Sequence, residues 1–63
     1  MEFVIQLQRK GKIEFYVVLV RLADRDVWRF LRSFYTYDRA ANFISQVKKD
    51  FAKGDYTWLT RIV

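Results

Sequence analysis

The chain has 63 residues, 19% of them aromatic, and twelve basic side chains against seven acidic ones give a net charge of +5. Cysteine and histidine are both absent, which excludes disulfides and leaves no thiolate or imidazole ligand for a structural zinc ion. A single domain of this size, residues 1–63, buries only about 60% of the surface that its unfolded chain exposes, so we expect a dense aromatic core, self-association or both to supply stability.

The first half of the chain predicts three strands. Residues 1–8 alternate apolar and polar side chains, which is the period of a half-buried strand. A charged turn containing Gly11 follows, and residues 13–23 are rich in β-branched and aromatic side chains, as is typical of a strand. A polar break over residues 23–26 separates this segment from a third strand over residues 27–35. The three segments together predict an antiparallel meander.

The period changes to that of a helix over residues 36–54. Apolar side chains recur there at helical spacing, at Ala40, Phe43, Ile44, Val47 and Phe51. We expect Thr36 or Asp38 to cap the first amides, and Gly54 to follow the end of the helix. Residues 55–63 indicate a last strand. The sequence therefore predicts an α+β fold of order β-β-β-α-β, in which a small antiparallel β-meander with a C-terminal strand packs on one α-helix.

Strand register sorts the side chains of the predicted sheet onto two faces. The first hairpin turns at Lys10-Gly11 or at Gly11-Lys12, and both positions give the same face membership. A turn at Asp24-Arg25 sets the third strand. The face assigned to the helix, which is the more uniformly apolar, holds Phe3, Ile5, Leu7, Tyr16, Val18, Val20, Leu22, Val27, Leu31 and Tyr35. The other face holds Val4, Gln6, Gln8, Ile13, Phe15, Val17, Leu19, Arg21, Trp28, Phe30, Arg32 and Phe34.

The second of these faces is the candidate binding site. Left bare, it is a larger apolar patch than monomers usually expose, and Trp, Phe and Arg are enriched at binding hot spots. The candidate protein-binding residues are Phe15, Trp28, Phe30, Arg32 and Phe34. Two alternatives remain open. The face pairs with a second copy in a homodimer, or a curled sheet, a bulge or the last strand makes it part of the core.

Basic residues along the hairpins indicate a second class of function, the binding of nucleic acid. The candidate residues are Arg9, Lys10, Lys12, Arg21, Arg29 and Arg32. Arginine reads guanine edges or holds phosphates, a two-stranded ribbon fits the major groove, and aromatics beside arginine suit stacking on unpaired bases. Solvation at a hairpin tip and packing of arginine stems over a sheet face account for the same residues equally well.

The segment SFYTYDRAANFISQVKKDF resembles part of a known DNA-binding layout. It is similar to the arm-type DNA-binding domains of phage and transposon integrases, and to the plant ethylene-response DNA-binding domain. The matching residues are Phe34, Thr36, Ala40, Phe43 and Ile44. The resemblance implies a three-stranded sheet that carries a helix on one face and enters the major groove with the other. Family sheets carry polar and Arg residues on the DNA face, whereas aromatics dominate here, which favours a protein contact.

The residue types exclude the commonest catalytic chemistry. Without His or Cys, the commonest general base and the best nucleophile are missing, and no Gly-rich phosphate loop occurs. Asp24 and Asp26 are interpreted as turn residues. Two carboxylates in a turn are too few to form a calcium-binding loop. The longest apolar run, Phe15–Val20, has six residues, against about 20 for a membrane span. The first residues do not have the pattern of a signal peptide.

We therefore expect a non-enzymatic, soluble, cytoplasmic binding module with no cofactor, no metal and no small-molecule substrate. Its expected partner is a protein or a second copy of the chain rather than a membrane, in the manner of the small inhibitors that mobile elements encode. The alternative is a sequence-tolerant DNA- or RNA-binding protein that uses the basic hairpins.

Overall fold

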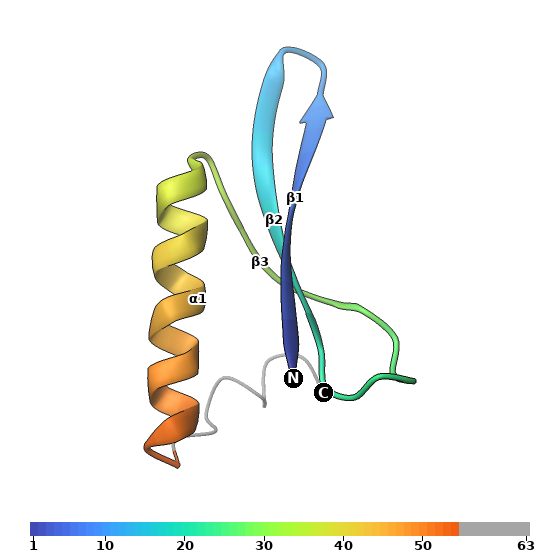
Figure 1. Ribbon diagram of the computed structural model, residues 1–63. Helices are drawn as coiled ribbons and strands as arrows, with labels where there is room; N and C mark the ends of the chain where they lie inside the picture. Colours follow the sequence, from blue (N-terminus) through green and yellow to red (C-terminus); the bar gives the residue numbers. More distant parts are fainter. Residues whose placement is uncertain (55–63) are drawn as a thin grey trace.

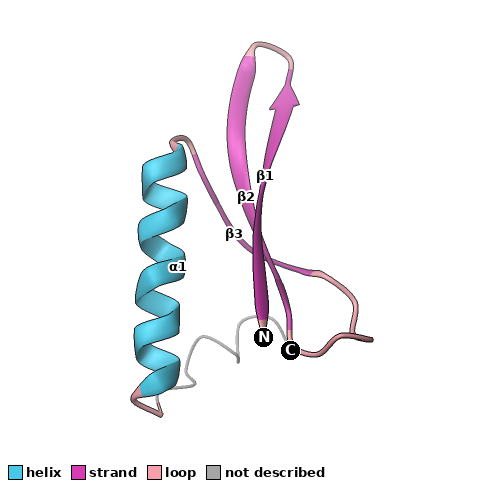
Figure 2. Cartoon of the chain, in the orientation of Figure 1, coloured by secondary structure: helices cyan, strands magenta, loops and turns pink. Residues whose placement is uncertain are grey.

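The computed structural model describes residues 1–54. It contains strands β1 (Glu2–Lys10), β2 (Ile13–Arg21) and β3 (Arg29–Phe34), followed by helix α1 (Tyr37–Ala52). The strands form one antiparallel sheet in the order β1-β2-β3, and α1 packs against one of its faces (Figures 1 and 2). The chain therefore has the expected α+β fold. The strand predicted for residues 55–63 lies outside the described residues.

Strands β1 and β2 form a long hairpin that turns at Gly11-Lys12. Gly11 has a φ of 64°, a left-handed conformation that a residue without a Cβ adopts at little cost. All nine residues of each strand are paired, from Glu2 opposite Arg21 to Lys10 opposite Ile13. The turn end of this hairpin projects past the start of α1 (Figure 1). Both faces of the sheet are consequently exposed near the turn.

A β-bulge interrupts the pairing of β2 with β3. Val20 lies opposite Arg29 as the predicted turn requires, but Val18 lies opposite Arg32, so that β3 contributes one extra residue. Because side chains alternate along a strand, the extra residue exchanges the faces of everything that follows it. The prediction that Arg32 and Phe34 face away from the helix is therefore wrong. The ring centroid of Phe34 lies 5.3 Å from that of Phe43 on α1.

Other residues that the sequence places between the sheet and the helix are more exposed than expected. Tyr35, expected under the helix, is 75% exposed because the bulge turns it the other way. Leu7 is on the helix side but 55% exposed, since this part of the hairpin extends beyond α1. Val27 is exposed in the loop before β3. The strand itself is shorter than the predicted residues 27–35, because it begins at Arg29 and ends at Phe34. Phe51, expected to complete the helix stripe, is 41% exposed in the last turn.

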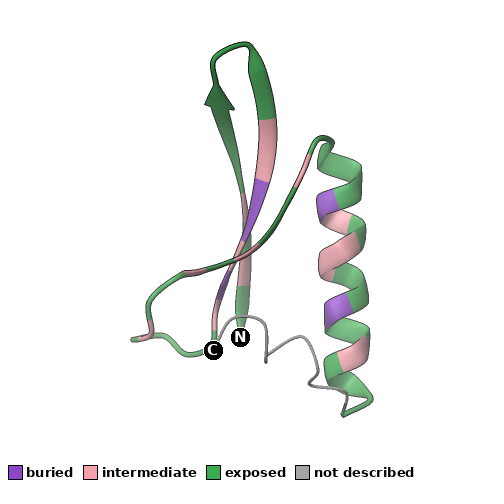
Figure 3. Cartoon of the chain, turned by 180° about the vertical axis from the view of Figure 1, so that it is seen from behind, coloured by how far each residue is buried: buried purple, intermediate pink, exposed green. Residues whose placement is uncertain are grey.

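The core lies between the centre of the sheet and α1. Its buried apolar residues are Val18, Val20, Ala40 and Val47, whereas Val17 is buried on the opposite face of the sheet (Figure 3). Phe3, Leu31 and Phe43 close around Val20 and Val47. Thr36 caps the helix by accepting a hydrogen bond from the Arg39 amide at 3.3 Å, as one of the two predicted caps. Within residues 1–54, no helix has the length and apolar character needed to cross a bilayer.

Candidate protein-binding face

The sheet face opposite α1, here called the open face, carries the candidate site. Within residues 1–54, only the other face packs against a helix (Figure 1). Directly opposite residues of an antiparallel sheet point to the same side, so the open-face side chains lie in rows across the strands. Starting at the end far from the hairpin turn, the rows are Glu2, Arg21 and Trp28; Val4, Leu19 and Phe30; Gln6, Val17 and Ser33; Gln8 and Phe15; Lys10 and Ile13.

The row of Val4, Leu19 and Phe30 is the apolar centre of the open face. Leu19 on the central strand is half-buried between its neighbours, whereas Val4 is 40% and Phe30 59% exposed. Trp28, in the adjoining row, is 40% exposed. Single exposed apolar residues are ordinary on a protein surface, but large ones gathered in adjacent rows form a patch of the kind that marks an interaction site.

Arg21 holds Trp28 at the edge of this patch. Its guanidinium carbon lies 4.8 Å from the centroid of the Trp28 ring, within the range of a cation–π contact. The same guanidinium donates a hydrogen bond to a Glu2 carboxylate oxygen at 2.6 Å. That hydrogen bond lowers the pKa of Glu2 below its ordinary value of 4.5. Glu2, Arg21 and Trp28 thus form a charged and aromatic border beside the apolar row.

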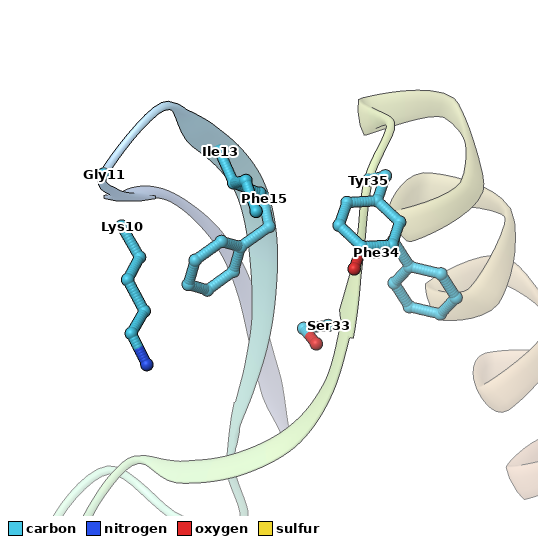
Figure 4. A pocket seen from close by; sticks show the side chains of 7 residues that line it. All are labelled: Lys10, Gly11, Ile13, Phe15, Ser33, Phe34 and Tyr35. Atoms are coloured by element: carbon cyan, nitrogen blue, oxygen red, sulfur yellow. The ribbon is translucent and has the colours of Figure 1, made fainter.

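A hollow of about 600 Å³ opens where β2 extends beyond the end of β3. Its lining residues are Lys10, Gly11, Ile13, Phe15, Ser33, Phe34 and Tyr35 (Figure 4). In Figure 4, the Phe34 and Tyr35 side chains lie on opposite sides of the chain at the end of β3, as consecutive residues of extended backbone do. Phe34 reaches toward α1, and Tyr35 lies on the open side with Ser33 and Phe15. The hollow extends the apolar surface of the open face toward the hairpin turn.

Most of the arginines proposed to bind nucleic acid already have partners. Arg9 forms an ion pair with Glu14, and Arg29 with Asp26 at 3.7 Å. Arg32, on the helix side, lies over the Phe34 ring, at 5.5 Å from its centroid. These interactions do not prevent phosphate contacts, but they leave few free cations on the hairpins.

Two lysines at the hairpin turn are the exception. Lys10 and Lys12 have no acidic partner among residues 1–54. They are exposed and belong to the part of the hairpin that projects beyond α1.

The structure brings together three of the five residues predicted to bind a protein. Trp28 and Phe30 lie in adjacent rows of the open face, and Phe15 lies nearer the turn on the same side. Arg32 and Phe34 are on the other face, so their side chains do not line this surface.

Two members of the open face were missed as candidate site residues. Val4 has a sequence signal, because its alternation with its neighbours already placed it on this face. Tyr35 has none, because its position depends on the bulge.

Residues 1–54 contain no cluster of three or more metal-ligating side chains of the types His, Cys, Asp and Glu. No protein-family model, curated protein or solved structure matches the chain.

Proposed function

We propose that the protein is a binding module that attaches to a protein partner through the open face of its sheet. One observation carries the proposal: Val4, Trp28 and Phe30 are each at least 40% exposed and lie in adjacent rows. Together they form an apolar surface that costs free energy while it faces water. A protein partner that covers it recovers that free energy, and Trp28 is of the residue type that most often dominates such contacts.

The charges around the patch favour a partner with an acidic border. The chain carries a net charge of +5, and Arg25, in the loop next to Trp28, has no acidic partner among the described residues. Charged residues at the border of an interface speed association and orient the partners, while the apolar centre supplies most of the affinity. The proposed partner therefore presents apolar side chains surrounded by carboxylates.

The apolar centre also makes a protein a better candidate than nucleic acid. A surface that binds DNA is usually polar and strongly basic, whereas the row of Val4, Leu19 and Phe30 has no charged side chain. The cations without acidic partners at the turn, Lys10 and Lys12, are several rows away from it. Contacts between these lysines and phosphates would not use the exposed aromatic residues.

The test compares Phe30→Ser with Leu7→Ser as bait for partners in an extract of the source cells. The two wild-type side chains are similarly exposed, at 59% and 55%, but lie on opposite faces of the sheet. Partners retained by the wild type are identified by mass spectrometry, and each is purified for affinity measurement. We expect Phe30→Ser to weaken the principal partner's binding by about thirtyfold, as the loss of a hot spot of roughly 2 kcal/mol does, and Leu7→Ser to change it less than threefold.

Equal binding by both variants would contradict the proposal, provided that their circular dichroism matches the wild type. A different contradiction would be tight binding of duplex or single-stranded nucleic acid that survives Phe30→Ser. Such binding would fall with salt with a log–log slope of about −0.9 per B-DNA phosphate neutralised. It would be abolished by the double change of Lys10 and Lys12 to Ala.

A further inference from the structure

The outer edge of β1 is a second surface that no strand of residues 1–54 covers, distinct from the open face. In the strand order β1-β2-β3, β1 has a strand neighbour on one side only within residues 1–54. Its backbone N–H and C=O groups on the other side therefore form an edge that can pair with a further strand. This edge is nine residues long, which is longer than most strands.

The edge lacks the features that usually block pairing. Natural edge strands are protected by proline, by bulges, by charged side chains in the middle of the strand or by being short. β1 pairs with β2 without a bulge, contains no proline, and has six consecutive uncharged residues from Phe3 to Gln8. A strand of this kind favours association with another strand.

We propose that the edge is filled by β1 of a second copy of this chain. The two strands are antiparallel and are related by a two-fold axis that passes between the Gln6 residues of the two copies. This is the register that pairs all nine residues, and it places residue i opposite residue 12 − i of the partner copy. Even-numbered residues then meet even-numbered ones, so both open faces lie on the same side of a six-stranded sheet. The proposal is independent of the partner proposed for the open face.

The ends of the strand are complementary in this register. Glu2 lies opposite Lys10 of the second copy at both ends of the pair, which brings opposite charges together twice. Lys10 has no acidic partner in the described part of its own chain, and Glu2 accepts the hydrogen bond from Arg21 with one of its two carboxylate oxygens. The paired strands thus give Lys10 an acidic partner, which it lacks among residues 1–54 of its own chain.

The β1 side chains on the sheet face that packs against α1 are also complementary between the two copies. Ile5 lies opposite Leu7 of the second copy, and Leu7 is 55% exposed in the single chain. Ile5 borders a hollow of about 390 Å³ between β1 and α1, whose lining also includes Phe3, Ala41 and Ile44. Leu7 of the second copy would lie at this hollow and bury apolar surface that is now exposed. Edge-to-edge pairing is at the small end of specific interfaces, so we expect dissociation constants in the micromolar range.

The test uses single cysteines, which the natural chain lacks. In the proposed register, Gln6→Cys places two Cα atoms about 4.5–5.5 Å apart across the axis, which a disulfide spans. Gln8→Cys places them about 14 Å apart along the strand, which is too far. Gln6 and Gln8 are both exposed and on the same face, so they are a matched pair. Under mild oxidation at micromolar concentration, we expect Gln6→Cys to form covalent dimers at least tenfold faster than Gln8→Cys.

Charge exchange tests the same register without oxidation. Lys10→Glu should weaken the dimer about tenfold in analytical ultracentrifugation, and the double variant Glu2→Lys/Lys10→Glu should recover most of that loss. Lys12→Glu makes the same change of net charge in the turn, away from the strand, and should have little effect. Equal cross-linking of the two cysteine variants, or a wild-type chain that stays monomeric at hundreds of micromolar, would overturn the proposal. The second result would be expected if residues 55–63 of the same chain filled the edge.

Discussion

At the scale of single residues, Glu2 and Arg21 set the border of the open face. Arg21 lies between Glu2 and Trp28, so one guanidinium forms both the ion pair and the cation–π contact. Its hydrogen bond stabilises the ionised form of Glu2 and thereby lowers the pKa of that carboxyl. Trp28 thus contacts this charge while it remains 40% exposed.

The lowered pKa of Glu2 gives a pH-dependent stability of known sign. Because the pKa is lower in the folded than in the unfolded chain, the ion pair stabilises the fold above the ordinary value of 4.5, and this contribution is lost as pH falls through the folded pKa. An NMR titration of the Glu2 side-chain carboxyl should give a pKa below 4.5 in the wild type and close to it in Arg21→Gln. A wild-type value at or above 4.5, or one that Arg21→Gln leaves unchanged, would contradict this account of the border.

At the scale of the elements, the order of three strands and a helix follows from patterns that the sequence displays directly. Alternation in β1 and the helical spacing of Ala40 and Val47 reflect burial on one side of an element, and the run of β-branched residues in β2 reflects a central strand buried on both sides. Gly11 and Thr36 mark a turn and a helix start, because their local conformations need those residue types. The first hairpin could therefore be predicted together with its faces.

The bulge in β3 could not be predicted in the same way. A strand with an extra residue has the same composition as one without it, and the difference lies in contacts with distant residues such as Phe43. Helix packing favours Phe34 on its side, where the two rings meet, and this tertiary preference changes the faces of the last residues of β3. The predicted face is therefore confirmed for Trp28 and Phe30, before the bulge, and wrong for Arg32 and Phe34 after it.

A pair of alanine substitutions tests the position of the bulge. Phe34→Ala removes a ring packed against α1 and should lower the free energy of unfolding by about 2–3 kcal/mol, somewhat less than for a fully buried phenylalanine. Tyr35→Ala removes a side chain that is 75% exposed and should change it by less than about 0.5 kcal/mol. Urea titration monitored by circular dichroism measures both values. If Tyr35→Ala were the more damaging change, β3 would pair without the bulge.

At the scale of the whole molecule, one helix covers one side of a sheet that is apolar on both. Among residues 1–54, the fully buried side chains beside α1 are small or medium in size, while several of the largest exposed ones lie on the open face. This distribution is unfavourable for an isolated domain and favourable for one that binds a partner. The open face and the free edge of β1 are two such surfaces. In the proposed dimer, the two open faces would form one continuous surface.

The most direct test of the central claim is the effect of Phe30→Ser on the free energy of unfolding, measured by urea titration of the isolated chain at low micromolar concentration. Phe30 is 59% exposed in the apolar row, so as part of a binding surface it adds little to the stability of the free protein. We expect the free energy of unfolding to change by less than about 1 kcal/mol. A loss of about 3–5 kcal/mol, as for a phenylalanine in a core, would contradict it, because the open face would then be an interior surface of the folded chain.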